Sequence, residues 1–118
     1  MADRRLLGHM GEQAAAEWYI AHGYRVIARN WRCAMGEIDI ICERQNPAGC
    51  MMLVVCEVKT RSSHSHGHPL EAVTLPKQRR LRRLATEYLR TQDTIYDHIR
   101  FDVVALTRHA LHIVEGAF

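Results

Sequence analysis

Apolar positions recur with helical spacing in two segments of the chain. Residues 7–22, rich in helix formers and followed by Gly23, predict a first helix whose apolar stripe consists of Leu7, Met10, Ala14, Trp18 and Ala21. A second helix is expected to open at Pro76, because apolar residues then follow the i, i+3, i+4, i+7, i+8 pattern of a buried face: Leu81, Leu84, Ala85, Tyr88 and Leu89.

Alternating and β-branched runs predict five strands, at residues 24–32, 36–43, 51–60, 100–107 and 111–114. The segment 43–50 contains Asn, Pro and Gly, which is typical of a hairpin loop. The expected order is α-β-β-β-α-β-β, in an α/β fold whose mixed sheet is flanked by helices. The long apolar stretch in 51–60 suits a central strand, and a short helical turn is expected at 70–73.

Two of these strands carry charged residues two positions apart in otherwise apolar runs. Side chains alternate between the faces of a strand, so Asp39 shares a face with Glu37, and Glu57 shares one with Lys59. A symmetric hairpin places Asp39 opposite Cys56 or Glu57, and the second register brings the two carboxylates to about 5 Å between Cβ atoms. Charges in such runs pair, bind a metal or do chemistry. The structural alternative is a cross-strand ion pair at a sheet edge.

Composition restricts the class of protein. The chain has 118 residues, 47% of them hydrophobic and 25% charged, which is typical of one soluble globular domain spanning residues 1–118. It begins without the apolar core of a secretory signal, and its longest apolar run is too short for a bilayer. We therefore expect a cytoplasmic protein that does not contact membranes. Four cysteines without zinc-type spacing are expected to be reduced thiols: Cys33, Cys42, Cys50 and Cys56.

The second predicted helix is strongly basic outside its apolar face, although the formal net charge of the chain is only +3. Its cations suit sequence-independent contacts with phosphates, and a merely solvated face is the alternative. They are Lys77, Arg79, Arg80, Arg82, Arg83 and Arg90. The candidates for phosphate or active-site contacts are Arg61, Lys77 and Gln78.

Two further polar groups have structural interpretations. His64, His66 and His68 alternate along a glycine-containing loop, which is compatible with a zinc or nickel site or with a mobile loop beside the active cleft. Arg100 and Asp102 share a face of the fourth strand and are expected to form a structural ion pair.

The charged strands resemble a nuclease signature. An acidic residue followed on the next strand by Glu-x-Lys, between two helices, resembles the PD-(D/E)xK motif of the restriction-endonuclease-like superfamily, with Asp39 and Glu57-Val58-Lys59 at the matching positions. Ile38 stands in place of the proline, which is not a ligand. Nearly the whole chain is similar to the YraN-type bacterial family, which resembles archaeal Holliday-junction resolvases. The matching blocks are GEQAAAEWYIAHGYRVIARNWR, GEIDII, VVCEVKTR, GHPLEAVTLPKQRRL and RFDVVAL.

This resemblance implies a metal-dependent endonuclease acting on DNA. The expectation that the DNA is branched or structured comes only from the resemblance to resolvases. Phosphodiester hydrolysis needs an activated water and stabilisation of transition-state charge, which Mg²⁺ or Mn²⁺ held by carboxylates provides. We expect Asp39 and Glu57 to bridge the metal, with the Val58 carbonyl as a third ligand. Lys59 is expected to orient the water and stabilise transition-state charge, because adjacent carboxylates favour its ammonium form.

Two more glutamates are candidates for this site. Glu12 matches a glutamate that resolvase-like members contribute from the first helix. It lies about 140° around that helix from Leu7, so a solvated position is its alternative. Glu37 could be a further ligand, but its place at a strand start, after Gly36, favours a solvated or structural role.

Three rival functions stay open. A non-catalytic nucleic-acid-binding protein could retain the fold, although the complete Asp-Glu-Lys set argues against it. RNA could replace DNA, but no aromatic platform for single strands stands out among two Trp, four Tyr and two Phe. A purely structural interaction module leaves the carboxylates unexplained. Symmetric cleavage of two strands, as in resolvases, requires a homodimer.

Overall fold

Five strands and two helices make up most of the residues that the computed structural model describes, namely 4–60, 71, 73–108 and 110–118, with the backbone alone for 4–8. Their order is α1 (Arg4–Ala21), β1 (Arg25–Cys33), β2 (Gly36–Gln45), β3 (Met51–Thr60), α2 (Leu75–Arg90), β4 (His98–Leu106) and β5 (Leu111–Val114). The predicted order and fold class are confirmed. Neither helix in these ranges is long and apolar enough to cross a membrane. The predicted histidine loop, Arg61 and most of the predicted turn at 70–73 lie outside the described residues.

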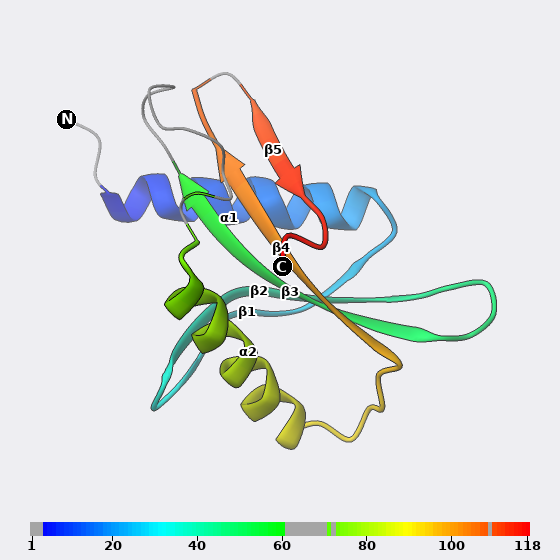
Figure 1. Ribbon diagram of the computed structural model, residues 1–118. Coiled ribbons are helices and arrows are strands. Elements are labelled where there is room, and N and C mark those ends of the chain that lie inside the picture. Colours follow the sequence, from blue (N-terminus) through cyan, green and yellow to red (C-terminus); the bar gives the residue numbers. More distant parts are fainter. Residues whose placement is uncertain (1–3, 61–70, 72, 109) are drawn as a thin grey trace.

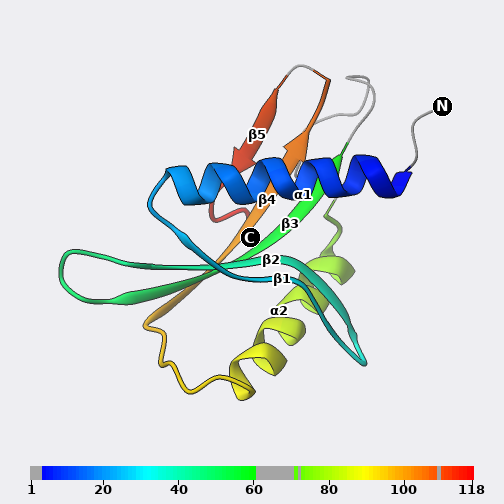
Figure 2. The ribbon, with the colours of Figure 1, turned by 180° about the vertical axis from the view of Figure 1, so that it is seen from behind.

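The strands form one mixed sheet in the order β1-β2-β3-β4-β5. Neighbours pair antiparallel except β3 and β4, which are parallel and are joined through α2. A parallel pair requires such a crossover, because its second strand must start again at the same end of the sheet. β3 is therefore central, as predicted. Figures 1 and 2 show that α1 covers one face of the sheet and α2 the other.

The buried face of α2 is the predicted one. Leu81, Leu84, Ala85 and Tyr88 are buried, and Leu89 packs against the same core. The helix begins at Leu75, directly before Pro76, and the Thr74 hydroxyl accepts a hydrogen bond from the Lys77 N–H at 3.4 Å. This cap places the first turn of α2, and with it Lys77, against the end of β3.

The predicted apolar stripe of α1 is confirmed only for Trp18, which packs against the core beside this helix. Met10 is 54% exposed and Ala21 is exposed, while Ala14 and Trp18 are half-buried; Leu7 lies where only the backbone is described. The face that meets the sheet consists instead of Gly11, Ala15, Ala16 and Tyr19. A Cβ added to Gly11 would collide with the Thr60 side chain. The helix therefore lies close to the sheet through small residues, which a search for large apolar side chains overlooks.

The Tyr19 hydroxyl joins α1 to an ion pair on β4. Asp102 accepts hydrogen bonds from Arg100 Nε and Nη2, both at 2.8 Å, from the Tyr19 hydroxyl at 2.7 Å and from the Gly116 N–H at 3.0 Å. Burial, together with the nearby Asp102 carboxylate, raises the pKa of Tyr19, so its hydroxyl stays a donor. The predicted structural pair is confirmed, and its carboxylate is fully satisfied as a buried charge must be.

The four cysteines are free thiols, as predicted. Cys42 and Cys56 lie in the core between α1 and the sheet. Burial raises the pKa of Cys42 to about 12 and that of Cys56 well above its ordinary value. These two thiols are therefore protonated and act as small apolar side chains.

Candidate metal centre

The hairpin of β2 and β3 brings the predicted carboxylates to the same level of the sheet. The pairing runs from Gln45 with Met51 to Ile40 with Cys56, and one further step in this register places Asp39 opposite Glu57. This is the second of the two predicted registers. The Val58 N–H donates a hydrogen bond to Asp39 Oδ2 at 2.8 Å, which fixes the aspartate beside the end of β3. The Val58 carbonyl as a metal ligand stays a prediction.

Three carboxylates converge near this point. Glu12 of α1 and Glu37 and Asp39 of β2 each offer an oxygen, and the three oxygens lie within 4.8 Å of one another. All three residues are half-buried, so the solvated alternative for Glu12 is wrong. Close contact of Gly11 with Thr60 brings Glu12 to the sheet. We call Glu12, Glu37 and Asp39 the acidic cluster.

The sequence favoured a solvated or structural role for Glu37, and its ion pair with Arg32 supports the structural one, while its role as a metal ligand stays a prediction. Its carboxylate is in the acidic cluster and also accepts a hydrogen bond from Arg32 Nε at 2.8 Å. The signal was its i, i+2 relation to Asp39, which puts both side chains on one face of β2. Its nearness to Glu12 depends on how α1 packs, which the sequence does not reveal.

The acidic cluster is electrostatically unbalanced. Burial and, after it, the charges of Glu57, Glu12 and Glu37 together raise the pKa of Asp39 to about 7, although the hydrogen bond from the Val58 N–H acts in the opposite direction. The charged form of Asp39 is therefore disfavoured by burial and by the neighbouring negative charges. A bound cation would favour the charged form.

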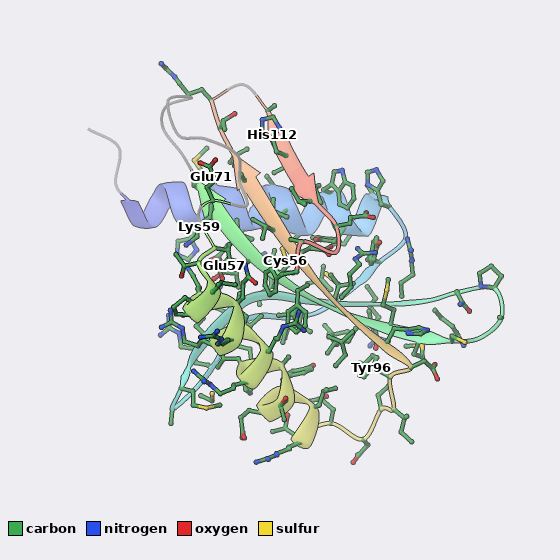
Figure 3. The ribbon with its side chains drawn as sticks, viewed as in Figure 1. Cys56, Glu57, Lys59, Glu71, Tyr96 and His112 are labelled. Carbon is green, nitrogen blue, oxygen red and sulfur yellow. The ribbon has the colours of Figure 1, made fainter. Side chains whose placement is uncertain are left out.

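A basic pair lies next to the acidic cluster. Lys59 Nζ and Lys77 Nζ lie 3.1 Å and 2.9 Å from the same oxygen, Glu57 Oε1, and Glu57 is buried with 7% exposure. Figure 3 shows Glu57 and Lys59 at the end of β3, beside the first turn of α2. Burial and the neighbouring Lys77 lower the pKa of Lys59 by more than Glu57 raises it, so the expectation that adjacent carboxylates favour its ammonium form is wrong in direction. Two lysines thus share one carboxylate, which leaves net positive charge on this side of the site when both are protonated.

A cavity of about 230 Å³ joins the two charged groups. Its polar lining comes from Glu37, Asp39, Glu57, Lys77 and Arg80, and its apolar wall from residues 36, 81 and 84. Lys77 was predicted to contact phosphate, and it reaches the cavity by pairing with Glu57. The lining therefore offers both carboxylates and cations to a small anion or a hydrated cation.

The arginines of the predicted basic surface of α2 have different surroundings in the structure. Arg79, Arg80, Arg82 and Arg83 are all exposed to solvent, and Arg80 also lines the cavity. Arg82 lies over the rings of Phe101 and Phe118, with Cζ 4.8 Å and 5.6 Å from the ring centroids.

The Gln78 side chain donates to the Val73 carbonyl at 3.1 Å and steadies the start of the helix. A contact of Gln78 with phosphate stays a prediction, as do contacts of Arg79 and Arg83.

The donor set of the acidic cluster fits a hard divalent cation. It consists of carboxylate oxygens alone, which suit Mg²⁺ and Mn²⁺ better than zinc or copper. Asp39 is half-buried and has a raised pKa, and no ion pair with it is found among the described residues, although its charge acts on Lys77 in the lining of the same cavity. Glu57, expected as a second bridging ligand, is engaged by two lysines instead, so its direct metal contact stays a prediction.

The fold and the site define an α/β protein whose mixed sheet carries a carboxylate cluster and a lysine pair at the end of its central strand. Residues 11–106 match the model of a family described as "Uncharacterised protein family UPF0102". The chain belongs to this family, and the predicted membership of the YraN-type family is confirmed.

Relatives in this family cover almost the whole chain. A UPF0102 protein of Symbiobacterium thermophilum is 51% identical over 119 residues, which is 97% of each chain. One of Leifsonia xyli subsp. xyli is 46% identical over 106 residues, covering 90% of this chain and 86% of the relative. One of Caldicellulosiruptor saccharolyticus is 42% identical over 122 residues, covering 98% and 99%.

Proposed function

We propose that this protein is a divalent-metal-dependent nuclease that hydrolyses phosphodiester bonds in DNA, with branched or structured DNA as the expected substrate. The observation that carries the proposal is the convergence of the acidic cluster within 4.8 Å, directly beside a buried glutamate shared by two lysines. Phosphodiester hydrolysis needs both features, because the attacking water must be activated and the charge on the phosphate must be stabilised.

The acidic cluster is the proposed holder of Mg²⁺ or Mn²⁺. When bound, the cation would lower the pKa of a water molecule and offset negative charge on the phosphate. Asp39 is the central ligand of the proposal, because the Val58 N–H fixes one of its oxygens and leaves the other for the metal. Its pKa of about 7 makes the carboxylate form dominant in mildly alkaline solution, where metal binding is therefore strongest.

The two lysines are the proposed positive side of the site. Lys59 is placed to orient the water and to stabilise the transition-state charge, as its position beside Glu57 supports. Lys77 adds a second ammonium group at the same carboxylate, and Arg80 lies on the wall of the same cavity. A phosphate entering this cavity would meet two cations on its wall, Lys77 and Arg80, while Lys59 lies at the Glu57 carboxylate. This suits a substrate oxygen that gains charge in the transition state.

The wider substrate contact is proposed to involve α2. Its exposed arginines Arg79 and Arg83 are on the same helix as Arg80, and contacts with flanking phosphates would give salt-dependent, sequence-independent affinity. DNA is the proposed nucleic acid. Symmetric cutting of a branched substrate needs a homodimer, so the proposal includes one only for that substrate.

A cleavage assay tests the proposal. Branched, flapped, single-stranded and duplex DNA, and RNA, are incubated with the purified protein in Mg²⁺, in Mn²⁺ or in EDTA. We expect cleavage of DNA with either metal, none in EDTA, and none with Asp39→Asn. Asp93→Asn is the matched control, because Asp93 is exposed and its substitution removes the same charge away from the site.

The outcomes separate the proposal from its rivals. Cleavage that persists in Asp39→Asn would identify a contaminant and reject the assigned site. Salt-sensitive DNA binding without cleavage in any metal would favour the non-catalytic binding protein. Cleavage of RNA alone would keep the chemistry and change the substrate.

A further inference from the structure

Asn30 has an unusual backbone conformation beside the acidic cluster. Its φ of 51° makes it the one non-glycine residue with positive φ in the described part of the chain. It lies on β1 between the pairs Arg29 with Ile40 and Trp31 with Ile38, which puts it across from Asp39. A left-handed residue inside a strand interrupts the regular pleat and redirects a side chain, and such outliers persist where the surroundings require them.

The redirected side chain reaches the acidic cluster. Asn30 Nδ2 donates a hydrogen bond to Glu12 Oε2 at 3.1 Å, and Asn30 is half-buried. Glu12 is the member of the cluster that comes from a helix, so its carboxylate reaches the strand residues Glu37 and Asp39 only when its side chain is held toward them. Asparagine suits this position for two reasons: it tolerates the left-handed region, and its side chain has an amide donor.

A neutral donor is the appropriate partner for a metal ligand. An arginine or lysine at this place would pair with Glu12 and compete with the cation there, and Arg32 already pairs with Glu37 in the same cluster. An amide orients the carboxylate by donating a hydrogen bond to one of its oxygens and leaves its charge intact. Residues that hydrogen-bond to metal ligands usually have this role.

A simple docking contact between α1 and β1 is the alternative role. The structure contains such a contact between the neighbouring residues, because Arg29 Nη1 donates a hydrogen bond to Gln13 Oε1 at 2.9 Å. This pair also joins α1 to β1 but involves no member of the acidic cluster. It therefore supplies a matched control for Asn30.

We propose that Asn30 is a positioning residue of the metal centre, which holds Glu12 in the acidic cluster through its side-chain amide and its left-handed backbone. The inference rests on the proposed function, since it assigns Asn30 a role toward the proposed metal. It concerns Mn²⁺ affinity rather than cleavage, so it is testable without a substrate.

The test is Mn²⁺ titration calorimetry on the full chain with Asn30→Gly, which suits the positive φ and removes the amide. We expect Mn²⁺ to bind about 10-fold more weakly than to the wild type, in the range seen for residues behind metal ligands. Gln13→Ala, which breaks the neighbouring contact, is expected to bind Mn²⁺ like the wild type. Urea unfolding without metal checks that each variant is folded.

A double-mutant cycle with Glu12→Ala, which removes the acceptor of the Asn30 amide, separates positioning from docking. If Asn30 acts through Glu12, adding Asn30→Gly to Glu12→Ala weakens Mn²⁺ binding no further. Wild-type affinity in Asn30→Gly, or an equal loss in both backgrounds, overturns the proposed role while the metal centre stands. A wild-type chain that binds no Mn²⁺ overturns the metal centre, and the role of Asn30 with it.

Discussion

Lys77 Nζ lies 2.9 Å from Glu57 Oε1, so the first turn of α2 is tied to the end of β3 by an ion pair. Lys59 Nζ reaches the same oxygen at 3.1 Å. The Glu57 side chain is only 9% exposed, and such a carboxylate needs its cations. This contact serves the fold as well as the proposed chemistry, because it closes one side of the cavity.

Substitution of Lys77 should therefore destabilise the protein. Lys77→Gln leaves Glu57 with one ammonium group, and we expect the free energy of unfolding to fall by about 1–2 kcal/mol, less than for a fully buried pair because Lys77 is partly exposed. Arg79→Gln removes the same charge from the solvent side of the helix and should change it by less than about 0.5 kcal/mol. Urea unfolding measures both. Equal effects would mean that the pair contributes nothing specific.

The acidic cluster should make stability depend on pH through Asp39. Its pKa is about 7 in the folded protein and 3.8 ordinarily, so its contribution to stability is present below about pH 4 and is lost as the pH rises through 7. Asp39→Asn keeps an acceptor for the Val58 N–H and removes the charge. Without metal, we expect the variant to be more stable than the wild type by about 1–3 kcal/mol at pH 8, with the difference shrinking toward pH 5.

Urea unfolding at pH 5 and pH 8, in EDTA, measures this difference, with Asp93→Asn as the control for loss of one exposed acidic charge. Added Mn²⁺ should reverse the order at pH 8, because the wild type gains a ligand that the variant binds weakly. A variant that is less stable than the wild type at pH 8 in EDTA would show that Asp39 is not under electrostatic strain.

The close approach of α1 to β3 should tolerate no side chain at residue 11. Gly11→Ala puts a Cβ into the Thr60 side chain, and the resulting displacement should lower the free energy of unfolding by about 1–3 kcal/mol and weaken Mn²⁺ binding by moving Glu12. The second substitution Thr60→Ala removes the colliding atom and should restore part of both losses. Failure of the double variant to recover either property would place the cause in the helix itself.

The parts of the site that the sequence predicts are those that follow from local geometry. Strand alternation and a symmetric hairpin reduce the position opposite Asp39 to Cys56 or Glu57, and the structure selects the register that leads to Glu57. Large apolar residues at helical spacing suffice for the buried face of α2.

The parts that escape prediction depend on packing between distant elements. The prediction of the buried face of α1 fails because Gly11, Ala15 and Ala16 pack closely against the sheet as small residues, not as large apolar side chains. The place of Glu37 beside Glu12 and the contact of Lys77 with Glu57 follow from how closely each helix approaches the sheet. The distance of α1 from the sheet and the distance of α2 from the sheet cannot be predicted from residue spacing along the chain.

The arginines of α2 should differ in their contribution to DNA binding, because the structure gives them different surroundings. Arg80 lines the cavity, whereas Arg82 lies over Phe101 and Phe118. Arg80→Gln should reduce the slope of log affinity against log salt concentration by about 1, as the loss of one phosphate contact does. Arg82→Gln should leave that slope unchanged and lower the free energy of unfolding by about 0.5–1 kcal/mol through loss of the ring contacts.

Fluorescence anisotropy with labelled duplex and branched DNA at several salt concentrations, in EDTA, measures the slopes, and urea unfolding measures the stabilities. Arg83→Gln, on the exposed side of the helix, shows how far the contact extends beyond the cavity. If Arg82→Gln flattens the slope as much as Arg80→Gln, DNA meets α2 along its whole length and pulls Arg82 from its rings. If none of the three substitutions changes the slope, the nucleic acid binds elsewhere, and the cations of the cavity serve Glu57 alone.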